Sequence, residues 1–126
     1  MSGFAFDANI LIDALGGIAM ARTEIDRATT LSSRAWISRI AWVEVMSKGA
    51  PQMLAGMEHF LSGFDIDELD PEIARRAAAL RRERPRLRSP DAIILASAQV
   101  RGRILITRNT KDFPANMPGI RVPYTL

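Results

Sequence analysis

The sequence predicts an α/β fold in which helices cover both faces of a short parallel β-sheet (an α/β/α arrangement). Short apolar and β-branched segments alternate with longer segments of helical periodicity, as in repeated strand–helix units. Gly and Pro residues separate many of these segments, which marks the turns. The chain has 126 residues, 48% of them hydrophobic, which is enough for one buried core. We therefore expect residues 1–126 to form a single domain.

The N-terminal half predicts two strand–helix units. Gly16 and Gly17 interrupt the first helical segment, and Gly49 and Pro51 end the last one. The expected elements are strands at 3–7 and 35–40 and helices at 9–15, 18–30 and 41–48.

The C-terminal half adds further helices and strands whose starts are marked by capping residues. Asp70 is suited to cap a helix that has Pro71 at its first position. Ser89, Pro90 and Asp91 repeat this pattern. The expected elements are a helix at 51–61, an edge strand at 64–69, helices at 71–84 and 92–100, and strands at 103–107 and 120–122.

Composition excludes several kinds of site. The chain has no Cys and a single His, His59, so thiol nucleophiles, Fe–S clusters, Cys-based zinc sites and multi-histidine centres are excluded. Any bound metal must therefore use oxygen ligands. No uninterrupted apolar run reaches the roughly 18 residues that a membrane span needs, so we expect a cytoplasmic protein without membrane contact.

Acidic residues follow two of the expected strands. Asp7 ends the first strand, and Asp112 lies in the loop after the strand at 103–107. In parallel sheets ligands bind beyond the carboxyl ends of strands, so these two residues are expected at the same edge. Each also has a purely structural explanation, because Asp7 can cap a helix and Asp112 can pair with Lys111 or Arg108.

Glu44 and Asp91 extend this set of acids. Glu44 interrupts an apolar helical run, where a solvated acid would be out of pattern. Asp91 has a structural alternative, since an acid in the first turn of a helix interacts favourably with the helix dipole. Four carboxylates at one edge would repel each other unless a cation lay among them. Oxygen ligands alone select Mg²⁺ or Mn²⁺, which points to phosphodiester chemistry.

Four segments, in this order and spacing, resemble the PIN-domain toxins of the VapC or FitB-like type. The segments are FDANILIDAL, residues 38–45 with the embedded Glu44, SPDAIILASAQVRG and ILITRNTKDF. The resemblance implies one PIN-like domain over residues 1–126. It also implies an endoribonuclease, dependent on Mg²⁺ or Mn²⁺, that acts as the toxin of a toxin–antitoxin pair and hydrolyses RNA with a metal-activated water.

The resemblance assigns the metal and catalytic roles to acids of these segments. It implies Asp7, Glu44, Asp91 and a fourth position, at which many relatives have an acid and this chain has Asn109. Because Asn carries no charge and other relatives use the acid three residues later, we assign the fourth role to Asp112. Glu44 either supports a second ion or accepts the proton of the attacking water. Supporting roles are assigned to Asn9, Thr107 and Asn109.

Seven arginines lie between positions 75 and 88, directly before Asp91. They could simply form the solvated face of a helix, since Arg is a good helix former. Alternatively, they set positive potential beside a site that accepts a polyanion. On that interpretation the RNA-binding residues are Arg81, Arg82, Arg84, Arg86 and Arg88.

The resemblance further implies a homodimer and a cognate antitoxin, which together can form a hetero-oligomer. The alternative function is a catalytically weak PIN-like module that binds RNA or protein, with Asn109 marking a weakened site. A metal-dependent phosphatase for small phosphoesters is a further alternative, but the basic cluster favours a polymeric substrate.

Overall fold

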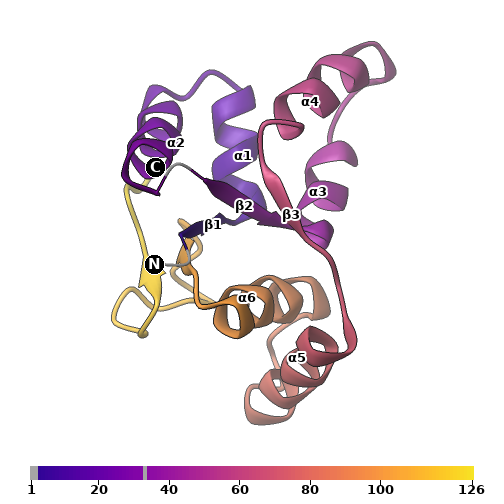
Figure 1. The fold of residues 1–126 in the computed structure, drawn as a ribbon, viewed down its shortest axis with the longest axis vertical. Helices are drawn as coiled ribbons and strands as arrows, with labels where there is room; N and C mark the ends of the chain where they lie inside the picture. Colours follow the sequence, from indigo (N-terminus) through magenta and orange to yellow (C-terminus); the bar gives the residue numbers. More distant parts are fainter. Residues whose placement is uncertain (1–2, 33) are drawn as a thin grey trace.

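The computed structural model describes residues 3–32 and 34–126, whose strands form one parallel sheet (Figure 1). The order of the strands is β3-β2-β1-β4-β5, so the first strand of the chain lies at the centre. The strands are β1 (Phe4–Phe6), β2 (Ala35–Ser38), β3 (Asp65–Asp67), β4 (Ile104–Ile106) and β5 (Ile120–Arg121). The predicted parallel α/β fold is confirmed.

Helices cover both faces of this sheet. Figure 1 shows α5 and α6 on one face and α1 and α2 on the other, with α3 and α4 beside α1. Among the described residues, no helix has both the length and the apolar character needed to cross a membrane. The helices are α1 (Ala8–Leu15), α2 (Ala19–Ser32), α3 (Arg39–Met46), the 3₁₀ helix η1 (Pro51–Met53), α4 (Leu54–Leu61), α5 (Pro71–Glu83) and α6 (Ser89–Arg101).

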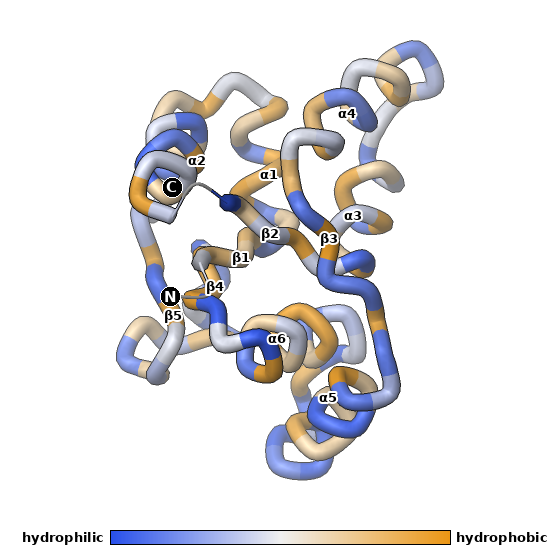
Figure 2. The backbone as a smooth tube through the Cα atoms, in the orientation of Figure 1, coloured by the Kyte–Doolittle hydropathy of each residue, from blue (hydrophilic) through white to orange (hydrophobic). Residues whose placement is uncertain are grey.

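The central strands are buried on both faces, which explains their continuous apolar sequences. Phe6, Ile37 and Leu105 are fully buried. The outer helices are polar where they meet solvent, and Figure 2 shows hydrophilic residues along the segment that leads from β3 into α5. The apolar core therefore holds rigid the strands whose carboxyl ends carry the acids.

Two boundaries differ from the sequence prediction, each for a reason of capping. The strand predicted at 35–40 ends at Ser38, because the Ser38 hydroxyl accepts a hydrogen bond from the Ile40 amide (3.2 Å) and so starts α3. The predicted cap at Ser89 is wrong. Helix α6 already includes Ser89, and the residue at its cap position, Arg88, makes no side-chain capping bond. The predicted cap at Asp70 is confirmed by its hydrogen bond from the Ile73 amide.

Candidate active site

Asp7 lies where β1 ends and α1 begins. Its side chain is buried and accepts three hydrogen bonds: from the Ala8 amide (2.7 Å), the Thr107 hydroxyl (2.8 Å) and the Asn9 amide group (3.2 Å). The contact with Ala8 is the helix cap that the structural explanation of Asp7 requires. Both Asp7 oxygens are therefore held in a fixed orientation at the carboxyl edge of the sheet.

Polar side chains connect this edge to the loop after β4. Strands β1 and β4 are parallel neighbours, which places the residues that follow them side by side. The Thr107 hydroxyl donates to Asp7 and accepts from the Asn109 amide (3.0 Å). Asn9 Oδ1 accepts from the amide of Arg108 (3.3 Å). The structure thus brings the predicted supporting residues Asn9 and Thr107 into direct contact with Asp7.

Asp112 and Asn109 hold each other within this loop. Asn109 Nδ2 donates to Asp112 Oδ2 (3.0 Å), and the Asp112 amide donates to Asn109 Oδ1 (3.2 Å). The alternative pairing of Asp112 with Arg108 does not occur, because Arg108 binds Asp13 instead, at 2.6 and 2.9 Å. Asn109 therefore orients the carboxylate that stands three residues after it.

Asp91 and Glu44 reach the same region from two helices that pack against each other, α6 and α3. Asp91 is 6% exposed, and its Oδ2 atom has no hydrogen-bond partner among the described residues, although Arg88 Nε lies 3.6 Å away. Glu44 is half-buried on α3. A buried carboxylate oxygen without a hydrogen bond is unfavourable, so Asp91 lacks a partner of the kind that a cation provides.

Electrostatic coupling links these acids. Burial is the main reason that the pKa of Asp7 rises to about 6, and the charge of Asp91 contributes to the rise against the opposing hydrogen bonds. Burial also raises the pKa of Glu44, followed by the charges of Asp7 and Asp91. The pKa of Asp91 is raised by burial and then by Asp112, against the opposing effect of Arg88. The four predicted acids therefore form one coupled group of mutually repelling charges.

The donor set fits Mg²⁺ or Mn²⁺, although the ligands are not fully assembled. No group of three or more His, Cys, Asp or Glu side chains in residues 3–32 and 34–126 is arranged so that it could already hold a metal ion. The acids nevertheless offer only hard oxygen donors, and one of these, Asp91 Oδ2, is buried without a hydrogen bond. Like charges resist further approach until a cation compensates them.

Comparison with known proteins now identifies the fold. The family model for the PIN domain matches residues 4–116. The chain belongs to the PIN-domain family. No curated protein sequence matches this PIN domain.

Solved structures agree with this assignment. The PIN domain is 41% identical to a chain of a toxin–antitoxin complex from Klebsiella pneumoniae, with a TM-score of 0.88 over 97% of this chain and 98% of that one. A chain of DNA-bound VapBC from Salmonella typhimurium is 28% identical, with a TM-score of 0.78 and 96% of both chains covered. FitAcB from Neisseria gonorrhoeae, at 18% identity and a TM-score of 0.78, covers 98% of this chain and 99% of its own and shows the same fold. The predicted resemblance to VapC- and FitB-like toxins is confirmed.

The arginines of the PIN domain do not form one uniform patch. Helices α5 and α6 pack against each other, and Arg76 Nε donates to Gln99 Oε1 (2.7 Å) near the C-terminal end of α6. Gln99 lies eight positions after Asp91, which is about 12 Å along a helix. Arg76 and its neighbour Arg75 are therefore remote from the acids, whereas Arg84, Arg86 and Arg88 precede α6 beside them.

Several of the arginines near the site already have partners. Arg81 Nε donates to the Leu87 carbonyl (3.0 Å), and Arg88 pairs with Asp91. Arg84 donates to the main-chain carbonyl of Asp112. Positioning of the Asp112 loop by Arg84 was not predicted from the sequence, since the two residues are 28 positions apart.

A second unpredicted network supports the loop after β4 from the opposite side. Asp13 on α1 receives a bidentate contact from Arg108 and a hydrogen bond from the Tyr124 hydroxyl (2.8 Å). Both arginine and tyrosine donors lower the pKa of Asp13, with the Arg108 hydrogen bond first. Asp13 interrupts an apolar helical run just as Glu44 does, so the same criterion would have found it.

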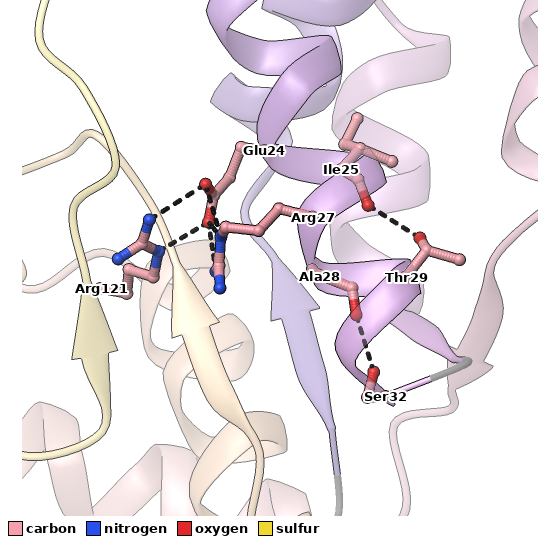
Figure 3. A network of polar contacts seen from close by, with 7 residues as sticks. All are labelled: Glu24, Ile25, Arg27, Ala28, Thr29, Ser32 and Arg121. Atoms are coloured by element: carbon pink, nitrogen blue, oxygen red, sulfur yellow. Dashed lines mark hydrogen bonds and ion pairs between the residues drawn. The ribbon is translucent and has the colours of Figure 1, made fainter.

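Burial of an acid alone does not mark the site, as Glu24 shows. Glu24 on α2 is 4% exposed and is held by Arg27 and Arg121 (Figure 3). Burial raises the pKa of Glu24, but the hydrogen bonds and charges of these arginines outweigh it and lower the pKa. Glu24 thus joins α2 to β5 as a compensated ion pair. The acids of the candidate site differ because their pKa values are raised.

Proposed function

We propose that this PIN domain is a Mg²⁺- or Mn²⁺-dependent endoribonuclease and the toxin of a toxin–antitoxin pair. One observation carries the proposal: Asp7, Glu44 and Asp91 are coupled acids with raised pKa values, and Asp91 Oδ2 is buried without a hydrogen bond. A cation would relieve both the repulsion and the unmet oxygen. The similarity to a chain of the toxin–antitoxin complex from Klebsiella pneumoniae supports the biological role.

The metal would be held by Asp7, Asp91 and Asp112, with Glu44 at the edge of the set. Thr107 and Asn9 fix the carboxylate of Asp7, and Asn109 fixes that of Asp112. When bound, Mg²⁺ or Mn²⁺ supplies a Lewis acid that polarises the phosphate and lowers the pKa of water.

Glu44 is suited to accept the proton of the attacking water. Burial and the charges of Asp7 and Asp91 raise its pKa, so its carboxylate holds a proton more strongly than a solvated Glu does. Attack on phosphorus with departure of the 3′-oxygen leaves a 5′-phosphate and a 3′-hydroxyl. RNA would approach along Arg81, Arg82, Arg84, Arg86 and Arg88.

The proposed partners are a cognate antitoxin and a second copy of this chain. The neighbours from Klebsiella pneumoniae, Salmonella typhimurium and Neisseria gonorrhoeae are, respectively, a toxin–antitoxin complex, DNA-bound VapBC and FitAcB. We infer that this PIN domain assembles in a similar way, as a homodimer that the antitoxin joins.

RNA cleavage by purified, antitoxin-free protein tests this function. A labelled RNA should be cut in millimolar Mn²⁺ and left intact in EDTA. Asp91→Asn keeps the shape of the side chain and removes its charge, so cleavage should fall at least about 100-fold while the fold is retained. Equal cleavage by wild type and Asp91→Asn would show that a contaminant or another site is responsible.

A weaker, non-catalytic binding module is the second candidate, favoured by Asn109 and by the incomplete assembly of the ligands among the described residues. Thermal unfolding separates the two. A ligand that binds only the folded state stabilises it by RT ln(1 + [L]/Kd). Millimolar Mn²⁺ should therefore raise the melting temperature of the wild type and not of Asp7→Asn. Identical melting curves with and without Mn²⁺ would support the binding module.

A further inference from the structure

A basic cavity lies beside the candidate site and is not one of its predicted parts. It has a volume of about 540 Å³ and is lined by Arg84, Pro85, Arg86, Leu87, Lys111 and Asp112. The first four residues connect α5 to α6, and the last two belong to the loop after β4. Because Asp112 lines the cavity and is coupled to Asp91, the cavity adjoins the acids.

The cations of this cavity are available to a ligand. Arg86 and Lys111 are exposed, and neither forms a hydrogen bond or an ion pair with any residue in the described ranges. The acid in the lining, Asp112, is already bound by Asn109. The cavity therefore presents uncompensated positive charge from two separate segments of the chain.

Arg84 supplies an unmet donor at the same place. One of its terminal nitrogens donates to the Asp112 carbonyl, while the other, NH1, is buried and has no hydrogen-bond acceptor among the described residues. A buried guanidinium nitrogen without an acceptor is costly. The planar array of guanidinium donors matches the oxygens of a phosphate group, which an arginine can bind at two points.

We propose that the basic cavity binds a backbone phosphate of the RNA strand, next to the phosphate that is cut. This inference rests on the proposed function and adds a specific anchor to it. Arg84 would hold the phosphate and the Asp112 carbonyl together, and Arg86 and Lys111 would neutralise its charge. Strand binding would thereby fix the position of Asp112. Lys111 is a new member of the RNA-binding set.

Binding of RNA without metal tests the cavity independently of cleavage. The probe is a fluorescein-labelled oligouridylate of about 20 nucleotides in EDTA, followed by fluorescence anisotropy, and it is long enough to span several phosphate sites. The cavity variant is Arg86→Gln with Lys111→Gln. Its control, Arg34→Gln with Arg75→Gln, removes the same charge from exposed residues away from the acids. Melting temperatures of both variants should match that of the wild type, since all four side chains are exposed.

The cavity variant should bind the probe at least about 10-fold more weakly, and the control should change affinity less than about twofold. The slope of log K against log salt should become shallower by about 0.7 for each phosphate that the cavity variant no longer neutralises. Equal weakening in both variants would overturn the inference, because net charge alone would then explain binding.

Competition identifies the source of the phosphate. Unlabelled oligouridylate should displace the probe, whereas inorganic phosphate at the same phosphate concentration should not. Complete displacement by inorganic phosphate would contradict a backbone site, as would displacement by an acidic peptide such as hexaglutamate.

Failure of the cavity and failure of the proposed function give different results. If the wild type cuts RNA in Mn²⁺ but both variants bind the probe equally, the cavity assignment is wrong and the nuclease stands. If the cavity variant alone binds the probe weakly but the wild type does not cut RNA, the cavity is supported and the nuclease is wrong.

Discussion

The hydroxyl of Thr107 donates a hydrogen bond to Oδ2 of Asp7 at 2.8 Å, although the two residues are 100 positions apart in the chain. The bond forms because β1 and β4 are parallel neighbours, and Asp7 and Thr107 are the residues that directly follow them. The same hydroxyl accepts from the Asn109 amide, so one side chain connects Asp7 to the loop that carries Asp112.

Replacing Thr107 with Val removes this connection while keeping the shape of the side chain. Residues that orient metal ligands typically contribute 10- to 100-fold to metal affinity or activity, so Thr107→Val should lower both by about 10-fold. Mn²⁺ titration by calorimetry and the rate of RNA cleavage measure the two effects. Unchanged Mn²⁺ affinity would show that the hydroxyl does not help to orient Asp7.

The raised pKa of Asp7 predicts a dependence of stability on pH. Burial raises this pKa from 3.8 to about 6, so at intermediate pH the folded state binds more protons than the unfolded state. Stability of the metal-free protein should therefore rise as pH falls from 7 toward 4. Above pH 6 the buried charge costs about 3 kcal/mol, from the size of this pKa shift.

Asp7→Asn tests this sign, because Asn carries no charge at any pH. In EDTA at about pH 8, Asp7→Asn should melt several degrees above the wild type, and the difference should vanish near pH 4. Differential scanning calorimetry at both pH values measures it. A lower melting temperature of Asp7→Asn at the higher pH would mean that the charged carboxylate stabilises the fold.

The fold was predictable because each element depends on local chemistry. The continuous apolar sequences of β1 and β4 predict buried parallel strands, and Asp70 with Pro71 predicts the start of α5. The start of α6 was misplaced because the Ser-Pro-Asp sequence resembles a cap, whereas the helix already includes Ser89. Capping residues therefore predict a helix start to within about a turn.

The fourth acid is decided by comparing Asp112→Asn with Asn109→Ala. Asn109 binds both the carboxylate and the amide of Asp112, so it orients this residue and does not replace it. Cleavage should fall at least about 100-fold in Asp112→Asn and about 10-fold in Asn109→Ala. Rates under single-turnover conditions give the ranking, and the reverse order would make Asn109 the ligand.

The C-terminal segment should matter for the site through Tyr124. Its hydroxyl donates to Asp13, which holds Arg108 at the start of the loop after β4. Tyr124→Phe should lower the free energy of unfolding by about 1.5–3 kcal/mol, the usual contribution of a hydrogen bond to a charged group. Urea denaturation measures this, with Tyr124→Leu as a comparison for removal of the ring. Equal stability of Tyr124→Phe and wild type would exclude the hydrogen bond as a support.

The candidate site was predictable only in part. Asp7 and Asp112 follow strands, and Glu44 and Asp91 complete a set of segments that resembles a known family. The contacts that orient them were not predictable, because Arg84 with Asp112 and Tyr124 with Asp13 join distant positions. Glu24 shows the converse limit, since a buried acid in a helix can be a compensated ion pair that serves the fold.

A crystal soaked in Mn²⁺ tests the central claim most directly, because the anomalous signal locates the ion without reference to activity. We expect one peak or more among Asp7, Glu44, Asp91 and Asp112, with carboxylate oxygens at about 2.0–2.2 Å. The peak should disappear in Asp91→Asn. A wild-type crystal with no Mn²⁺ between these four residues, or with Mn²⁺ bound only elsewhere, would contradict the account.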